Sequence, residues 1–410
     1  MGVWEAWEAA RSDPPALAAV PAPLPDPAGI PPREWLYGTR LVRRFVSVLA
    51  APGGAGKSAL ALAQAVALAT GRPILNERVH HAAPAWVLNL EDPLDELNRR
   101  LAACLRLHGL PDDAVRDRLF LHSGRQRRVC LAALDARGMV VHPDRDAVAA
   151  AARARQVGLI VVDPFVKSHA LDENSNPHMD AAATAWAEVA EAAGAAVLLV
   201  HHVRKLGGAA VDVEAARGAK ALTDAARAAA VLSAMAPEEA ERLGVAPAER
   251  WRHVRLDDAK ANMAPRAEAA QWFRLESIPL GNATALYPAG DTVAAVAAWT
   301  PPSPFADLSA ADANRALDQI AAGPAPGVRF AATRQGGVAA ERWAGTVLMR
   351  FGPTEAAATR ILGAWLRNGL LEETDYRDPV HRKTRRGVRV VDARRPTVSA
   401  AEGARDGAGG

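Results

Sequence analysis

The chain has 410 residues, half of them hydrophobic, with a formal net charge of +3 and two cysteines. One core stops growing near about 250 to 300 residues, so this length favours a large domain plus a smaller one. The longest apolar run, residues 59–70, is too short to cross a bilayer, the first ten residues lack the pattern of a secretory signal, and Cys104 and Cys130 form no C-x-x-C pair. We expect a cytoplasmic protein with no membrane segment, no disulfide framework and no cysteine zinc site.

Taken in chain order, the sequence begins with a proline-rich stretch, and we expect residues 1–32 to be an extended leader. Short apolar strands then alternate with helical stretches, which predicts an α/β domain over 33–280, with a mainly parallel sheet covered by helices on both faces. The expected strands are 45–50, 85–90, 159–162 and 196–201, and the expected helices are 57–70, 94–108, 145–156 and 179–193. Further strand-like runs at 226–233, 252–257 and 271–276 lack comparable helices between them, which indicates an antiparallel extension.

The composition changes to Pro, Gly, Thr and Ala after Leu280, and we interpret residues 281–306 as a linker. A second domain is expected over 307–393, followed by a disordered tail over 394–410. Its expected elements are helices at 310–322, near 338–350 and at 354–368, then strands at 370–374 and 387–391. Helices followed by such a hairpin predict a small winged helix-turn-helix domain.

The strongest local motif is A-P-G-G-A-G-K-S at residues 51–58, between an expected strand and an expected helix. Backbone amides of such a loop bind phosphate oxygens, the lysine extends to the β and γ phosphates, and the serine hydroxyl binds Mg²⁺. The first glycine of the usual pattern is Ala51 here, and the alternative is an ordinary glycine-rich turn. We expect ATP and Mg²⁺ to bind this loop. The expected nucleotide contacts are Pro52, Gly53, Gly54, Ala55, Gly56, Lys57, Ser58 and Ala59.

Two further strands end in acidic residues, at the sheet edge where the loop also lies. Residues 158–163 form an apolar run that ends in Asp163, which we expect to bind Mg²⁺ together with Ser58. The strand before Glu91 and Asp92 ends at the same edge, and Glu91 is the candidate that orients the attacking water. The alternatives are a turn-forming Asp163 and a Glu91 that caps the next helix; we assign capping to Asp92.

The strand at 197–200 runs into His201 and His202. Adjacent side chains on a strand point to opposite faces, so at most one of the two lines the site, and we choose His202 as the residue that contacts the γ-phosphate. The alternative is a structural histidine. A metal site is not expected here, because neither this pair nor His80 and His81 has the spacing of metal ligands.

In sequence order, these motifs resemble the RecA-like ATPases of the RepA type, a family that includes ring-shaped hexameric helicases. The resemblance covers roughly residues 35–276. It rests on the phosphate loop, N-L-E-D-P at 89–93, Val162-Asp163, His169 with Glu173-Asn174, L-V-H-H at 199–202, Arg217-Gly218, Asp224, Arg227 and K-A-N at 260–262. The C-terminal region is an addition to the family pattern.

The resemblance implies roles that the spacing alone does not show. Arg227 matches an arginine finger that acts on a neighbouring subunit's nucleotide, and Lys260 matches the lysine that accompanies it. The segments 169–180 and 206–216 match loops that face the central channel. Arg204 and Lys205, which come just before the second segment, are candidate DNA contacts. A guanidinium suits the transition-state charge of phosphoryl transfer. Without the resemblance, an equally good interpretation of Arg227 is a solvated arginine at the edge of a strand.

Basic residues gather near the hairpin expected in the second domain. In a winged helix, 354–368 is the recognition helix and 377–386 the wing, and the candidate DNA contacts are Arg360, Arg382, Lys383, Arg385 and Arg386. The alternatives are a solvated charge run and a protein-binding module.

Together these features favour an ATP-hydrolysing DNA motor that forms a homo-oligomeric ring, expected to be a hexamer, and serves as the replicative helicase of a plasmid, phage or other mobile element. The second hypothesis is a non-motor ATPase switch of the same fold, whose C-terminal domain docks DNA or protein. A DNA-binding regulator with an inactive ATPase conflicts with the joint presence of Lys57, Glu91, Asp163 and Arg227.

Overall fold

The computed structural model describes residues 19, 21, 26–203, 220–265, 267, 269–302, 308–334 and 340–396. Most of the expected leader lies outside these residues, apart from a short 3-10 turn at Pro27–Gly29. None of the helices in the described part is long and apolar enough to cross a membrane.

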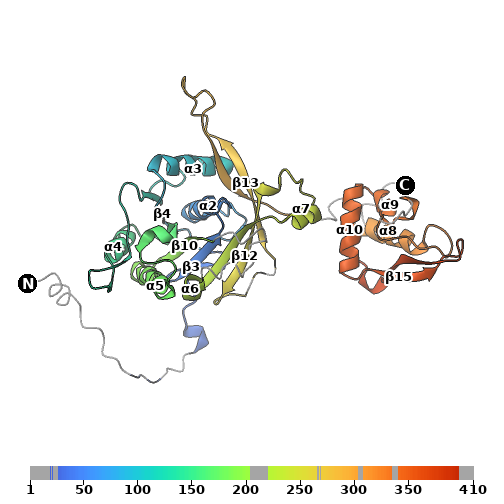
Figure 1. Ribbon diagram of the computed structural model, residues 1–410, viewed down its shortest axis with the longest axis horizontal. Coiled ribbons are helices and arrows are strands. Elements are labelled where there is room, and N and C mark those ends of the chain that lie inside the picture. Colours follow the sequence, from blue (N-terminus) through green and yellow to red (C-terminus); the bar gives the residue numbers. More distant parts are fainter. Residues whose placement is uncertain are drawn as a thin grey trace, which may run out of the picture. The chain divides into compact units, whose positions relative to one another are not determined.

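A nine-stranded sheet, in the order β14-β13-β12-β11-β3-β10-β8-β4-β5, organises the α/β part (Figure 1). Strands β11, β3, β10, β8, β4 and β5 are parallel, whereas β12, β13 and β14 continue the sheet in antiparallel fashion. The strands are β3 (Val46–Ala51), β4 (Ala85–Asn89), β5 (Leu119–Ser123), β8 (Leu159–Asp163), β10 (Ala196–His202), β11 (Ala228–Ala234), β12 (His253–Ala261), β13 (Gln271–Pro279) and β14 (Thr292–Ala298).

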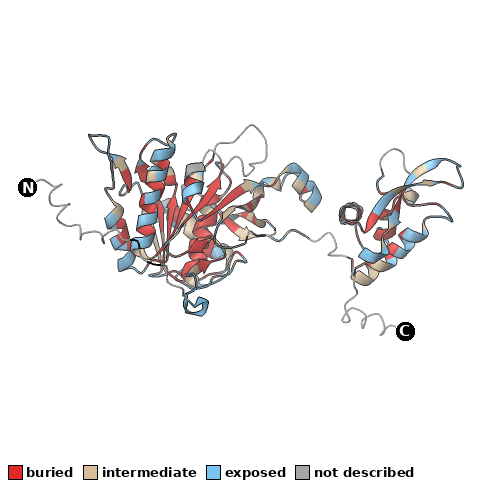
Figure 2. Ribbon diagram, turned by 90° about the horizontal axis from the view of Figure 1, so that it is seen from below, coloured by how far each residue is buried: buried red, intermediate tan, exposed pale blue. Residues whose placement is uncertain are grey.

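Helices cover both faces of this sheet, and each face has its own core. Helices α2 (Lys57–Thr70) and α3 (Leu94–Leu107) lie on one face, whereas α4 (Arg145–Ala154), α5 (Asn176–Ala193) and α6 (Lys220–Ala225) lie on the other (Figure 1). The central strands are buried on both faces, which explains their continuous apolar runs (Figure 2). The predicted α/β class is therefore confirmed, with a mixed, mostly parallel sheet.

Smaller elements surround the sheet. A two-stranded ribbon and a three-stranded sheet flank it, and α7 follows β11. Their bounds are β1 (Trp35–Tyr37) and β2 (Leu41–Val42); β7 (Val140–Val141), β6 (Ala132–Leu134) and β9 (His169–Ala170); and α7 (Pro237–Leu243).

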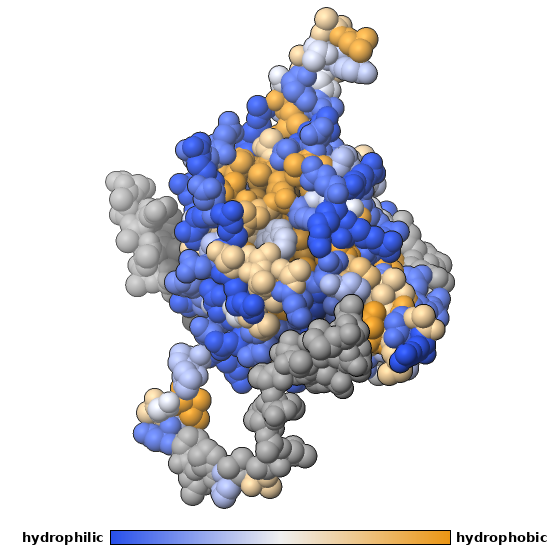
Figure 3. Space-filling model, turned by 90° about the vertical axis from the view of Figure 1, so that its left-hand side faces the viewer, coloured by the Kyte–Doolittle hydropathy of each residue, from blue (hydrophilic) through white to orange (hydrophobic). Residues whose placement is uncertain are grey.

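Part of the expected linker 281–306 belongs to the sheet instead. Residues Thr292–Ala298 form β14, which pairs with β13 from Thr292 opposite Pro279 to Ala298 opposite Phe273. The connection between these strands exposes Leu286 and Tyr287, whose relative exposures are 76% and 68%. Figure 3 shows this connection as a projection with apolar colour at its tip. The linker prediction was wrong for this strand because pairing with β13 gives an alanine-rich segment its strand conformation.

The C-terminal part has its own core of apolar side chains, including Trp343 and Trp365. Its elements are α8 (Ala310–Ala322), α9 (Gly345–Met349), α10 (Glu355–Arg367) and an antiparallel hairpin of β15 (Leu371–Arg377) and β16 (Thr384–Val390). Three helices followed by a hairpin is the order that the sequence predicts. The winged helix-turn-helix class stays a prediction.

Candidate nucleotide-binding site

The loop between β3 and α2 has the backbone form of a phosphate cradle. Gly54 and Gly56 have φ values of +79° and +84°, in the left-handed region that favours glycine. A Cβ on Gly56 would lie 2.6 Å from Cδ2 of Leu275, so this position combines an unusual φ with a close neighbour. Gly56 is also the N-cap of α2 and has no side chain to bind the first N–H groups of the helix. Those groups are available to phosphate oxygens.

Ser58, on the first turn of α2, and Asp163, at the end of β8, lie together. The Ser58 hydroxyl hydrogen-bonds the Asp163 carboxylate, whose residue is only 5% exposed. Burial raises the pKa of Asp163, and the Ser58 hydrogen bond and the Lys57 charge oppose that rise. One hydroxyl and one carboxylate form the donor set that Mg²⁺ uses when phosphate oxygens and water complete its octahedron. The described residues hold no group of three or more His, Cys, Asp or Glu side chains that could bind a metal by themselves.

Lys57 is the first residue of α2 and is 6% exposed. Desolvation lowers the pKa of its ammonium, whereas the charges of Asp163 and Glu91 raise it. The structure therefore brings Lys57, Ser58, Glu91 and Asp163 to the same edge of the sheet. The Lys57 ammonium offsets part of the carboxylate charge at this edge, and Mg²⁺ bound there would offset more of it, so that the phosphates of a nucleotide could be held.

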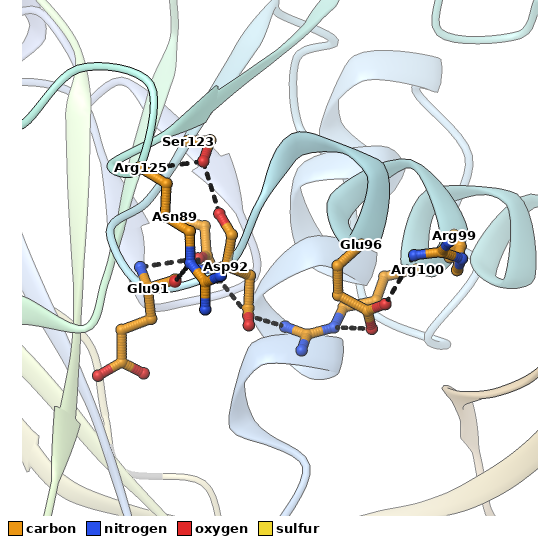
Figure 4. Close-up of polar contacts among 8 residues, drawn as sticks. All are labelled: Asn89, Glu91, Asp92, Glu96, Arg99, Arg100, Ser123 and Arg125. Carbon is orange, nitrogen blue, oxygen red and sulfur yellow. Dashed lines mark hydrogen bonds and ion pairs between the residues drawn. The ribbon is translucent and has the colours of Figure 1, made fainter.

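Glu91 follows β4 and is exposed. The preceding Asn89 is buried and bonds the backbone of the loop, and Figure 4 shows the Glu91 carboxylate pointing away from this network. The prediction that Asp92 caps α3 was wrong. The N-cap is Pro93, and the Asp92 carboxylate pairs with Arg100 at 2.9 Å. Proline at the helix start moves the cap one residue onward and leaves Asp92 to bind a side chain from the second turn of α3.

The two histidines at the end of β10 lie in different surroundings, in line with their opposite directions on the strand. His201 packs near Phe165, with ring centroids 6.4 Å apart, and burial lowers its pKa to about 4. His202 is exposed, and its pKa is lowered by desolvation and by Lys57, whereas Glu91 and Asp163 raise it. His202 is thus the histidine that shares the electrostatic environment of the nucleotide edge.

Arg227 and Lys260 lie away from the phosphate loop, towards the end of the sheet where β3 begins. The Arg227 amide donates to the carbonyl of Val46, the first residue of β3, and the Arg227 side chain is exposed. The phosphate loop follows the last residue of β3, about 16 Å along the strand at about 3.3 Å per residue. Lys260 Nζ donates to the carbonyls of Thr223 and Asp224, at 3.0 and 2.7 Å. Neither side chain lies at the phosphate loop of its own chain.

The expected DNA contacts divide into three groups. Arg204, Lys205 and the segment 206–216 lie outside the described residues. Arg360 is partly exposed on α10, and Arg382 and Lys383 are exposed in the turn of the hairpin. Arg385 instead pairs with Asp378 at 3.2 Å and Arg386 with Glu373 at 3.2 Å, so these two expected DNA contacts already have carboxylate partners.

Several residues at the nucleotide edge were missed by sequence reasoning. Ser123 and Arg125 reach the loop that carries Glu91, and the charge of Arg100 acts on Asp163. The available signal was the short apolar run 119–121, which marks β5 as the strand beside β4. Without β5, nothing placed Ser123 and Arg125 beside Glu91.

Comparison with protein families supports this reading of the loop. The family model described as AAA domain matches residues 11–208, a range that includes the phosphate loop, Glu91, Asp163 and His202. It ends before Arg227, Lys260 and the C-terminal part. The family implies binding of a nucleotide, usually with Mg²⁺. The family model therefore covers the part of the chain that carries the phosphate loop, and the left-handed glycines of that loop agree with a P-loop ATPase domain there.

Proposed function

We propose that this protein is an ATP-driven DNA motor that assembles into a ring, as a replicative helicase of the RepA type serving a plasmid, phage or other mobile element. The observation that carries the proposal is the separation between Arg227 and the phosphate loop of the same chain. An exposed arginine matching an arginine finger, and out of reach of its own nucleotide, supports action on a neighbouring copy. A ring, by family likeness a hexamer, provides such a neighbour at every site.

The proposed reaction divides its roles between two copies. One copy supplies the phosphate loop, with Lys57 on the phosphates and with Ser58 and Asp163 as ligands of Mg²⁺. Its Glu91 orients the attacking water, and His202 contacts the γ-phosphate. The second copy supplies Arg227, held by a segment that Lys260 braces. Phosphoryl transfer depends mainly on positioning and on charge stabilisation, so each of these groups has a physical role.

One alternative has structural support: a non-motor ATPase switch whose C-terminal part docks a partner. The hairpin arginines Arg385 and Arg386 are paired with carboxylates, which weakens their attraction for DNA phosphates. The segment 169–180, expected to face the channel, exposes Asp172 and Glu173. These acids favour a protein partner over a DNA backbone.

Two measurements on the full chain separate these functions. ATP hydrolysis is measured with and without single-stranded DNA, and strand displacement is measured on a forked duplex. The motor predicts strong stimulation by single-stranded DNA together with unwinding that requires ATP. Hydrolysis that ignores DNA, without unwinding, would support the switch and exclude the motor. The particle mass with a non-hydrolysable ATP analogue tests the ring directly.

A further inference from the structure

The loop between β4 and α3 has no regular secondary structure, yet its backbone is held firmly by side chains. The Asn89 side-chain oxygen accepts hydrogen bonds from the amides of Glu91 and Asp92, at 3.1 and 2.8 Å. The amide of Leu90 donates to the Asp163 carbonyl at 2.8 Å. The loop is thereby fixed to both β4 and β8, the strand that carries the Mg²⁺-side carboxylate.

The neighbouring strand β5 holds the same loop from the other side. Ser123 Oγ donates to the Asp92 carbonyl at 2.6 Å, and Arg125 Nε donates to the Glu91 carbonyl at 2.6 Å (Figure 4). Between them, Gly124 lies so close that a Cβ there would stand 2.7 Å from Cα of Leu90. The amide and carbonyl of both Glu91 and Asp92 therefore have partners, and each partner is a side chain.

The Glu91 carboxylate, by contrast, has no hydrogen bond to the described part of the chain, and its charge is felt by Lys57 and His202. The arrangement combines a fixed backbone with a carboxylate that is available for water or nucleotide. A carboxylate that orients an attacking water needs a backbone fixed in this way, because a displacement of about 1 Å can cost about a hundredfold in rate.

We propose that Arg125 is a positioning residue for Glu91. It acts through its hydrogen bond to the Glu91 carbonyl and so fixes the direction of the carboxylate. The proposal rests on the proposed role of Glu91 in hydrolysis. Arg125 is exposed, so its removal leaves the core intact, and its partner is a backbone carbonyl of the residue that it positions. The bond is charge-assisted, a class roughly twice as strong as neutral hydrogen bonds.

The test compares Arg125→Ala with Arg128→Ala, which removes an exposed arginine three residues along the same segment. Steady-state hydrolysis by the full chain gives kcat, and a fluorescent ATP analogue gives the dissociation constant. Arg125→Ala is expected to lower kcat about tenfold, the scale of one such bond, and to change the dissociation constant by less than about twofold. Arg128→Ala is expected to leave both values unchanged.

A double mutant then separates a positioning role from a merely structural one. In a Glu91→Gln background, Arg125→Ala is expected to cause no further loss, because the carboxylate that it positions is already gone. A further tenfold loss in that background, an unchanged kcat in the single variant, or a loss confined to nucleotide binding would overturn the proposal.

Failure of the underlying function looks different. If Glu91→Gln hydrolyses ATP at the wild-type rate, the role given to Glu91 is wrong, and the positioning role falls with it. If Glu91→Gln is inactive while Arg125→Ala is fully active, only the positioning role is wrong. Ser123→Ala removes the buried donor to the Asp92 carbonyl and gives a second measurement of how side chains fix this loop. The thermal midpoint of the variant reports any loss of folding.

Discussion

The Ser58 hydroxyl hydrogen-bonds the Asp163 carboxylate, which connects the first turn of α2 to the end of β8. The two residues are 105 positions apart in sequence, and between them lie two strands of the main sheet and two of its covering helices. Their contact brings together the two side chains expected to bind Mg²⁺.

Replacing Ser58 by alanine removes one expected ligand of the metal and the hydrogen bond to Asp163. We expect hydrolysis to fall by about a hundredfold or more, on the scale of losing several kcal/mol of transition-state stabilisation. Ser58→Thr keeps the hydroxyl and is the matched control, expected to retain most of the activity. Hydrolysis rates over a Mg²⁺ titration provide the measurement, and equal Mg²⁺ dependence for alanine and wild type would contradict the assignment.

A side chain at Gly56 meets both a left-handed φ of +84° and Leu275. We expect Gly56→Ala to distort the phosphate loop and to weaken nucleotide binding at least tenfold, because the backbone amides no longer converge on the phosphates. Gly29→Ala, outside the phosphate loop, is the control, since a Cβ there meets no atom within 4 Å. Binding of a fluorescent ATP analogue distinguishes the two, and equal binding by both variants would show that the conformation at Gly56 does not matter.

The position of Arg227 predicts complementation between two inactive proteins. Lys57→Ala lacks a working phosphate loop but keeps its arginine, whereas Arg227→Ala has the reverse defect. If Arg227 acts on the neighbouring copy, an equal mixture should recover up to about a quarter of the sites, because each active site needs one particular order of neighbours. Mixed particles must first be shown to form; hydrolysis that stays at the level of the separate variants would then contradict action between copies.

His201 predicts a loss of stability in mild acid. Burial lowers its pKa from the ordinary value of 6.5 to about 4 in the folded protein, so the unfolded chain binds more protons between these pH values. The contribution of neutral His201 to the free energy of unfolding should therefore be fully present above about pH 6.5. It should be lost as the pH drops towards 4, by up to about 3 kcal/mol. His169 also packs against Phe165, with ring centroids 5.0 Å apart, and burial lowers its pKa too.

Urea denaturation at several pH values measures this effect. His201→Gln should flatten the dependence between pH 4 and 6.5, whereas His81→Gln, which changes an exposed histidine, should not. An unchanged slope in His201→Gln would mean that another buried group controls the acid response.

Much of the α/β part was predictable, because its signals are local. The helix expected at 57–70 is α2, and the strands expected at 85–90 and 159–162 end within one residue of β4 and β8. A glycine-rich loop, apolar runs and helical periodicity all lie within short stretches of sequence. The same reasoning placed Lys57, Ser58, Glu91 and Asp163 at one sheet edge, where the structure brings them together.

What the sequence did not reveal depends on contacts between distant segments. Strand β5 is short and only partly buried, and its place beside β4 is set by pairing of Ala85 with Leu119. Strand β14 is a run of small residues that becomes a strand by pairing with β13. Asp92 was expected to cap α3, but Arg100 from the second turn of that helix binds it instead. No pattern within one segment contains such pairings.

The way in which side chains hold residues 90–92 has a consequence for hydrogen exchange. Amide protons in an irregular, partly exposed loop ordinarily exchange with solvent within seconds or less, whereas those of Leu90, Glu91 and Asp92 are all donated to protein oxygens. Their exchange should be governed by opening of the surrounding sheet and not by local fraying. In a deuterium-labelling experiment this loop should thus behave like the strands beside it, and the amides of Glu91 and Asp92 should acquire the exchange rate of an ordinary loop only when Asn89 loses its side chain.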